Sequence, residues 1–146
     1  MFTLDTNILI YAHNEVPPFH KQAAAFVKQA LAERDEQGRH VAGIAALVYA
    51  EFINVITRQT IEQPLSLADA VLVVEKYLKA GTPTIYAQST QMHTFLDLAK
   101  STTTRKKIFD LFLAATLKDN GIDRLYTVNV DDFKDFAFLQ AANPLV

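Results

Sequence analysis

The opening residues Met1-Phe2-Thr3-Leu4-Asp5 have the pattern of a short buried strand that ends on an acid. The segment Asn7–His13 follows at once and is expected to form the first turns of a helix. This order of strand and helix recurs along the chain, which is typical of an α/β sandwich around a mainly parallel sheet. We therefore predict a three-layer α/β/α fold, in which ligands bind beyond the carboxyl ends of the strands, where Asp5 stands.

The 146 residues have the length of one domain, residues 1–146, and contain no internal repeat or long linker. Ser66 and Asp69 are spaced like a capping box with Asp in place of Glu, and Gly121 is placed to end a helix. The predicted strands are residues 1–5, 41–43, 84–86, 124–128 and 136–141; the predicted helices are 7–13, 20–36, 45–58, 66–79, 90–99 and 107–120, with a polar loop at 101–104.

The composition excludes several classes of protein. A formal net charge of -2 argues against a generic basic nucleic-acid coat protein. It does not exclude a nuclease, because the acidic residues of a metal site contribute negative charge that the bound cations would offset. The absence of cysteine excludes disulfides and thiolate zinc sites and suits a reducing cytosol. No secretory signal is visible, and the longest clean apolar run is too short to span a bilayer. We expect a cytoplasmic protein with no membrane partner.

Three acidic residues, Asp5, Glu51 and Asp110, stand in apolar surroundings. The apolar neighbours of Glu51 and Asp110 recur at helical spacing, which places both carboxylates on core-facing sides of their helices. Isolated buried carboxylates are costly unless they are paired, protonated or bound to a metal. We therefore predict that the three converge in one pocket around a divalent cation. Oxygen-only ligands favour Mg²⁺, with Mn²⁺ as an alternative.

Structural roles for the same acids stay open at this point. Asp5 has the position of an N-cap, a role compatible with metal binding. Glu51 could form a buried salt bridge with Arg58, two turns along its helix. Asp110, near the start of its helix, could gain from the helix dipole. Asp131 follows the predicted strand at 124–128. Asx capping of the turn there explains it at least as well as metal binding does.

Two further groups of residues extend the predicted site. Asn129 and either Asp131 or Asp132, which follow the predicted strand at 124–128, could complete it as direct ligands or through water. The run Arg105-Lys106-Lys107 lies just upstream of Asp110 and is the best candidate for contact with nucleic acid; a solvated helix start is the alternative explanation.

Four short motifs, in order along the chain, carry a family resemblance: Leu4–Ala12, Ala50-Glu51-Phe52 with Asn54 and Arg58, Phe109–Ala115, and Thr127-Val128-Asn129 with Asp132-Phe133. Together they resemble the PIN-domain family, and most closely its VapC-type toxins. The resemblance implies a Mg²⁺-dependent endoribonuclease, commonly a homodimer, held inactive by an antitoxin encoded beside it. Asp5, Glu51 and Asp110 match the metal-binding acids of the family.

The resemblance leaves some roles open. The fourth acidic position falls on Asp132 or is taken by Asn129, and Thr127 or Thr6 is expected to orient water or phosphate. Arg58 is expected to contact the RNA substrate. Phe109 is a departure, because members of this subgroup often have His before the third acid.

The main alternative function is a catalytically silent PIN-like module that binds RNA or protein. Retention of all three core acids argues against it. We expect a homodimer in which the apolar stripe of helix 66–79 packs against the same helix of a second chain. Ordinary core packing is the alternative explanation of this stripe. The stripe consists of Leu67, Ala70, Val71, Val74 and Leu78.

Overall fold

The computed structural model describes residues 1–16, 18–102 and 106–146. Its strands form one five-stranded sheet in the order β3-β2-β1-β4-β5, with the first strand at the centre. Each of the four strand pairings is parallel, which confirms the predicted sheet. The strands are β1 Phe2–Leu4, β2 Ala42–Ala45, β3 Thr84–Ile85, β4 Arg124–Tyr126 and β5 Gln140–Ala142.

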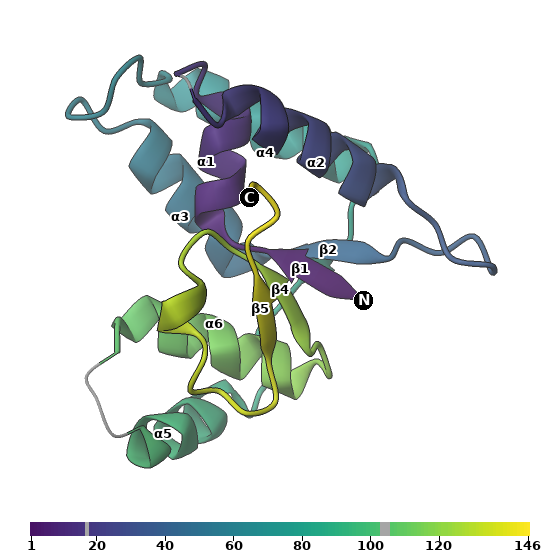
Figure 1. Cartoon of the computed structure of the whole chain (residues 1–146), viewed down its shortest axis with the longest axis vertical. Helices are drawn as coiled ribbons and strands as arrows, with labels where there is room; N and C mark the ends of the chain where they lie inside the picture. Colours follow the sequence, from purple (N-terminus) through teal and green to yellow (C-terminus); the bar gives the residue numbers. More distant parts are fainter. Residues whose placement is uncertain (17, 103–105) are drawn as a thin grey trace.

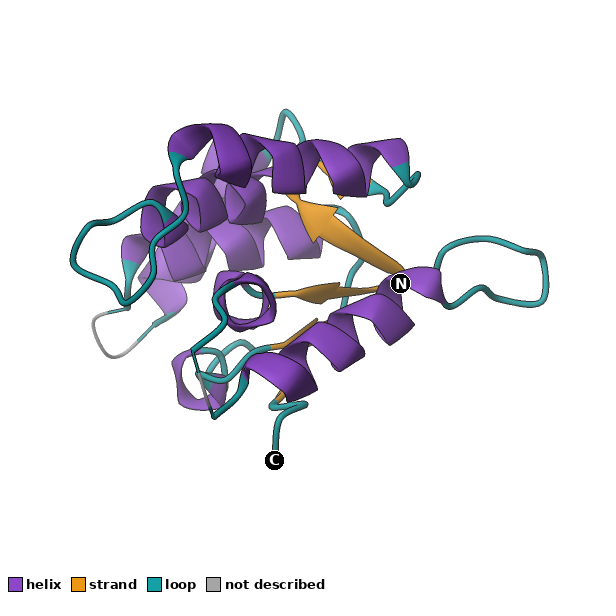
Figure 2. Ribbon diagram, turned by 90° about the horizontal axis from the view of Figure 1, so that it is seen from above, coloured by secondary structure: helices purple, strands orange, loops and turns teal. Residues whose placement is uncertain are grey.

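Helices lie on both sides of this sheet, as the three-layer prediction requires. In Figure 1, α1 to α4 gather above the strands while α5 and α6 lie below them, and Figure 2 again shows strands between helices. Within the described ranges, no helix is long and apolar enough to cross a membrane. The helices are α1 Thr6–His13, α2 His20–Ala32, α3 Ala46–Ile56, α4 Leu67–Lys79, α5 Gln91–Ser101 and α6 Ile108–Asp119, followed by a 3₁₀ turn at Val130–Asp132.

The central strands are apolar because both of their faces are covered. Leu4, Ile44 and Leu125, one from each of three adjacent strands, are almost completely buried. Strands in such a sheet have near-continuous apolar sequences rather than alternating ones. Thr3 is a buried polar exception, and its hydroxyl donates to the carbonyl of Gly43 at 2.7 Å. Because β1 pairs with β4 in parallel over this core, the carboxyl ends of the two strands lie side by side.

Helix α2 ends at Ala32, four residues before the predicted end at residue 36. The side chain of Asp35 accepts hydrogen bonds from the backbone N–H groups of Gln37 and Arg39, both at 2.9 Å. Gly38 adopts a φ of 77°, so the chain turns back towards β2. Local capture of the backbone by an Asp side chain competes with helix propagation here.

The last strand also differs from its predicted position, since β5 spans Gln140–Ala142 rather than residues 136–141. Phe136 and Leu139 are buried, but they pack from turns instead of alternating along a strand. Of the predicted loop at 101–104, Ser101 belongs to α5 and residues 103–104 lie outside the described residues.

Two end signals are confirmed. The hydroxyl of Ser66 accepts a hydrogen bond from the backbone N–H of Asp69 at 3.1 Å, which caps α4. Gly121 follows the C-cap of α6 with a φ of 68°, the left-handed conformation that favours glycine.

Candidate functional site

The site lies where the strand order of the sheet reverses. The chain builds β1, β2 and β3 outwards in one direction and then places β4 and β5 on the other side of β1. In open α/β sheets, ligands bind in the crevice at such a switch point, beyond the carboxyl ends of the strands. Asp5 follows β1 and Thr127 follows β4, and the Thr127 hydroxyl donates to Asp5 Oδ2 at 2.7 Å.

Asp5 combines the two roles that the sequence left open. Its Oδ1 accepts the backbone N–H of Thr6 at 2.8 Å, which caps α1. Only 7% of the residue is exposed. Burial raises the pKa of Asp5 above its ordinary value, and the hydrogen bonds from Thr127 and Thr6 offset part of that rise. The hydrogen bond that caps α1 therefore fixes the carboxylate in a buried position, where a bound cation would stabilise its negative charge.

Glu51 reaches the same crevice from α3. The apolar face of this helix packs into the core through Val48, Phe52 and Ile56. The Thr6 hydroxyl donates to Glu51 Oε2 at 3.1 Å. Burial raises the pKa of Glu51, the Thr6 hydroxyl lowers it, and the negative charge of Asp5 raises it further. Arg58 also lowers this pKa, but among the described ion pairs it makes no salt bridge with Glu51.

Asp110 enters from the first turn of α6. Burial, followed by the charges of Asp5 and Asp132, raises the pKa of Asp110 from 3.8 to about 6. A favourable helix dipole would lower this pKa, so the dipole does not dominate. The charge of Glu51 adds to the rise. Asp110 therefore belongs to a group of mutually repelling acids.

One cavity of about 530 Å³ joins these elements. All three predicted acids line it, as do Arg58 and Asn129. The full lining is Asp5, Thr6, Asn7, Ile10, Tyr11, Glu51, Asn54, Val55, Arg58, Lys107, Phe109, Asp110 and Asn129. The fold thus brings together residues from α1, α3, α6 and the loop after β4.

The two candidates for the fourth position occupy different places. Asn129 lines the cavity, whereas Asp132 is not part of its lining and lies 3.4 Å from Lys107 Nζ in a salt bridge. The charge of Asp132 still raises the pKa of both Asp5 and Asp110. Asp132 therefore acts electrostatically on two of the acids, and its role as a metal ligand stays a prediction.

The Lys and Arg residues that were predicted to contact the substrate also occupy different places. Lys107 and Arg58 line the cavity, and the Lys107 side chain is largely exposed. Lys106 instead forms a salt bridge with Asp135 at 2.7 Å, which holds its ammonium group outside the cavity lining. Arg105 lies outside the described residues.

Thr6 and Thr127 hold the acids in position. Each hydroxyl donates to a carboxylate, and Thr127 Oγ1 also accepts the backbone N–H of Asn129 at 3.0 Å. Their predicted contact with water or phosphate stays a prediction. Asn7, which the site prediction left out, donates to Thr127 Oγ1 at 3.3 Å and accepts the N–H of Val128 at 3.3 Å. It therefore ties α1 to the loop after β4.

Asn54 and Tyr11 are further lining residues that were not assigned to the site. Asn54 was recognisable as the other polar residue near Glu51 in its apolar segment, three positions further along the helix. Tyr11 gave no such signal, because an aromatic residue in an amphipathic helix normally belongs to the core.

The residues present fit a hard divalent cation, although they do not form a finished cage. Across residues 1–16, 18–102 and 106–146, no three His, Asp or Glu side chains lie close enough to chelate an ion directly. Mg²⁺ usually keeps several waters and uses only one or two carboxylates, so it needs no such triad. Three desolvated acids with raised pKa values are an arrangement that a cation would stabilise.

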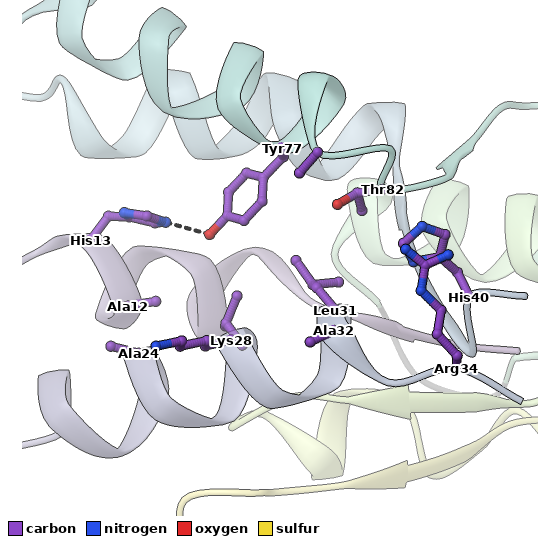
Figure 3. Close-up of a pocket in the computed structure, with 12 residues that line it drawn as sticks. Ala12, His13, Ala24, Lys28, Leu31, Ala32, Arg34, His40, Tyr77 and Thr82 are labelled. Atoms are coloured by element: carbon purple, nitrogen blue, oxygen red, sulfur yellow. Dashed lines mark hydrogen bonds between the residues drawn. The ribbon is translucent and has the colours of Figure 1, made fainter. Parts of the chain in front are cut away.

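A second cavity, of about 440 Å³, lies between α1, α2 and the end of α4 (Figure 3). Its described lining is mostly apolar, includes Leu31 and Ala32, and holds no carboxylate. His13 is hydrogen-bonded there to Tyr77, as Figure 3 shows. Burial lowers the pKa of His13, so the ring favours its neutral form. This cavity has no acids for metal-dependent chemistry, which places the candidate site in the acidic cavity.

The comparison with family models decides the classification. The PIN domain model matches residues 2–139, nearly the whole chain. The chain belongs to the PIN-domain family. Ribonuclease VapC24 of Mycobacterium tuberculosis is 30% identical over 147 residues, covering 99% of this chain and 97% of that protein.

Solved structures share the PIN fold. VapBC2 from Rickettsia felis, bound to a DNA fragment from its promoter, matches with a TM-score of 0.67 and 17% identity, covering 97% of both chains. A toxin–antitoxin complex from Klebsiella pneumoniae matches with a TM-score of 0.64 and 19% identity, covering 99% of this chain and 98% of the other. At these levels of identity, the similarity of the two structures to this chain shows a shared fold.

Proposed function

We propose that this PIN-domain protein is a Mg²⁺-dependent endoribonuclease and the toxin of a type II toxin–antitoxin pair. The observation that carries the proposal is the cavity lined by Asp5, Glu51 and Asp110, whose pKa values are all raised by burial. The similarity to a VapC ribonuclease over nearly the full chain supports cleavage of RNA.

The proposed chemistry assigns a role to each side of the cavity. Asp5, Glu51 and Asp110 would hold the cation, directly or through its bound waters, with Asn129 or Asp132 assisting. When bound, Mg²⁺ (or Mn²⁺) activates water for attack on a phosphodiester and stabilises the charge that develops on it. Lys107 and Arg58 supply positive charge for the phosphates of the substrate.

The proposed partners follow from the same similarities. Structures of the same fold include a toxin–antitoxin complex, which supports a cognate antitoxin that blocks the site. The substrate is RNA, and we place the protein in the cytoplasm, where such RNA is found.

The test is incubation of total RNA with the purified, antitoxin-free protein in Mg²⁺, followed by sequencing of new 5′ ends. We expect discrete cleavage sites. An Asp110→Asn preparation, purified in the same way, controls for contaminating nucleases. Intact RNA after incubation with the wild-type protein would contradict the proposal and favour a silent module that binds RNA or protein.

A homodimer is part of the proposal, and the surface of α4 supports it. Among the stripe residues of α4, core packing accounts for the buried Ala70 and for part of Val74, but it leaves the rest of the stripe exposed. Leu67, Val71 and Leu78 remain exposed on one side of the helix, beside the half-buried Val74. A second copy of the chain would cover this strip through a two-fold interface.

At micromolar concentration, we expect the wild-type protein to sediment as a species with twice the chain mass of 16.3 kDa. Val71→Asp places a charge in the exposed strip and should shift the species to the monomer, because an unpaired charge resists burial in an interface. Lys76→Glu, on another side of α4, is the matched control. Analytical ultracentrifugation gives the answer, and a monomeric wild type would refute the dimer.

A further inference from the structure

Phe109 is a large apolar side chain in an unusual place. It lies in the first turn of α6, next to Asp110, and 58% of it is exposed. The same side chain lines the acidic cavity. Most of the following residues of α6 are buried, including Leu111 and Leu113. Core packing therefore does not explain the aromatic ring at position 109.

The ring also lacks an aromatic partner within the described chain. Phe112, one turn further along α6, stacks on Phe95 with ring centroids 4.3 Å apart and planes 5° apart. Tyr11, another residue of the cavity lining, makes an edge contact with Phe19, with ring centroids 5.3 Å apart. No aromatic pair of the described residues includes Phe109. Much of its surface is open to a planar ligand.

The surroundings select the kind of ligand. Lys107 and Arg58 bring positive charge to the same cavity, and the three acids are suited to a cation at a phosphodiester. A cavity of about 530 Å³ is in the range that holds a small organic group such as a nucleobase. Exposed aromatic rings beside cationic groups bind unpaired nucleotides, because the bases stack on the rings while the phosphates meet the charges.

We propose that Phe109 is a stacking platform for an unpaired base next to the bond that is cut. This inference rests on the proposed ribonuclease function and assigns the recognition of an unpaired base to one side chain. A base inside a duplex is already stacked on both faces and is not available to the ring. Phe109 thus selects RNA by the accessibility of a base and not by its hydrogen-bonding edge.

A tryptophan at this position reports on stacking directly, because the chain contains no Trp. Phe109→Trp is made in the Asp110→Asn chain, so that the RNA stays intact. Ile108→Trp in the same chain is the matched control, since Ile108 is 51% exposed in the same turn but does not line the cavity. The probes are a randomised 12-nucleotide single-stranded RNA, an abasic ribose-phosphate chain of the same length, and a 12-base-pair RNA duplex.

We expect the single-stranded RNA to reduce the fluorescence of Trp at position 109 by about twofold or more, because the indole stacks on a base. The abasic chain and the duplex should change it little, and Trp at position 108 should not respond to any probe. Equal responses to the abasic and base-containing chains would overturn the proposal. So would the absence of any response to the single-stranded RNA.

Kinetics separate this inference from the proposed function. Phe109→Leu should lower kcat/KM on single-stranded RNA by about 5- to 100-fold, while Phe109→Tyr stays within about twofold of wild type. Circular dichroism checks that both variants are folded. If the wild type does not cut RNA, the proposed function fails, and the fluorescence still tests stacking. If the wild type cuts RNA and Phe109→Leu matches it, the stacking proposal alone fails.

Discussion

Asp110→Asn is expected to lower RNA cleavage by about a hundredfold or more, because it removes a carboxylate that would hold the catalytic cation. The substitution keeps the size of the side chain and leaves the apolar contacts of α6 in place. Initial rates on total RNA, with equal amounts of folded wild type and variant, measure the effect. A variant that cuts RNA at the wild-type rate would show that Asp110 has a structural role only.

The same substitution should stabilise the metal-free protein. A pKa raised from 3.8 to about 6 corresponds to at most about 3 kcal/mol of unfavourable interaction for the charged form. Solvent screening at this half-buried position reduces the expected gain to about 1–2 kcal/mol in the free energy of unfolding at pH 7.5. Urea unfolding in EDTA measures it, and a large loss of stability would contradict a repelled acid.

The stability gap between the variant and the wild type should close as the pH falls. Between pH 6 and about 4 the folded state binds a proton at Asp110 that the unfolded chain does not bind. Asp110 therefore contributes an increase in wild-type stability as the pH falls through this window. The lowered pKa of His13 acts in the opposite direction, but it is common to both proteins and cancels in the difference. A gap that stays constant from pH 7.5 to 5 would assign the stabilisation to something other than charge.

Removal of divalent cations is expected to stop cleavage completely, and Mg²⁺ or Mn²⁺ should restore it. The reason is that three acids without a cation would repel a phosphodiester, whereas a bound cation would activate water and stabilise the charge that develops. Cleavage should also fall below about pH 6, because a proton on Asp110 competes with the cation. Initial rates in EDTA, in Mg²⁺ and across pH 5 to 8 measure both effects. Undiminished cleavage in EDTA would refute the metal-dependent mechanism.

The acids were identifiable from sequence because they break a pattern. Glu51 and Asp110 stand on apolar helical faces, where a carboxylate has a desolvation cost that a merely structural helix avoids. Asp5 was identifiable from its place after the first strand, since parallel strands bring their carboxyl ends to one edge. The parallel sandwich itself followed from the alternation of strands and helices.

The contacts that orient the acids were not predictable, because they join residues far apart in the chain. Thr127 and Asp5 are 122 positions apart, and their hydrogen bond exists only once β4 lies beside β1. Lys106 was grouped with Lys107 as a substrate contact, yet its salt bridge with Asp135 draws it away. Local sequence contains no information about such partners.

The end of α2 shows a limit of reading helix ends from breaking residues. Residues 33–36, Glu-Arg-Asp-Glu, contain no Gly or Pro to stop a helix, so the prediction extends it to residue 36. The structure ends it at Ala32, and Asp35 captures the backbone N–H groups of Gln37 and Arg39. A side chain that competes for backbone hydrogen bonds can disfavour a helix in a segment that has no such breaking residue.

The central claim is that Asp5, Glu51 and Asp110 together bind a divalent cation in the shared cavity. Calorimetric titration of Mg²⁺ into the metal-free, antitoxin-free protein at pH 7.5 tests it most directly, with Asp110→Asn as the paired sample. The account predicts saturable binding by the wild type and a loss of affinity of about tenfold or more in the variant. Identical binding isotherms for the two proteins, or no binding by the wild type, would contradict it.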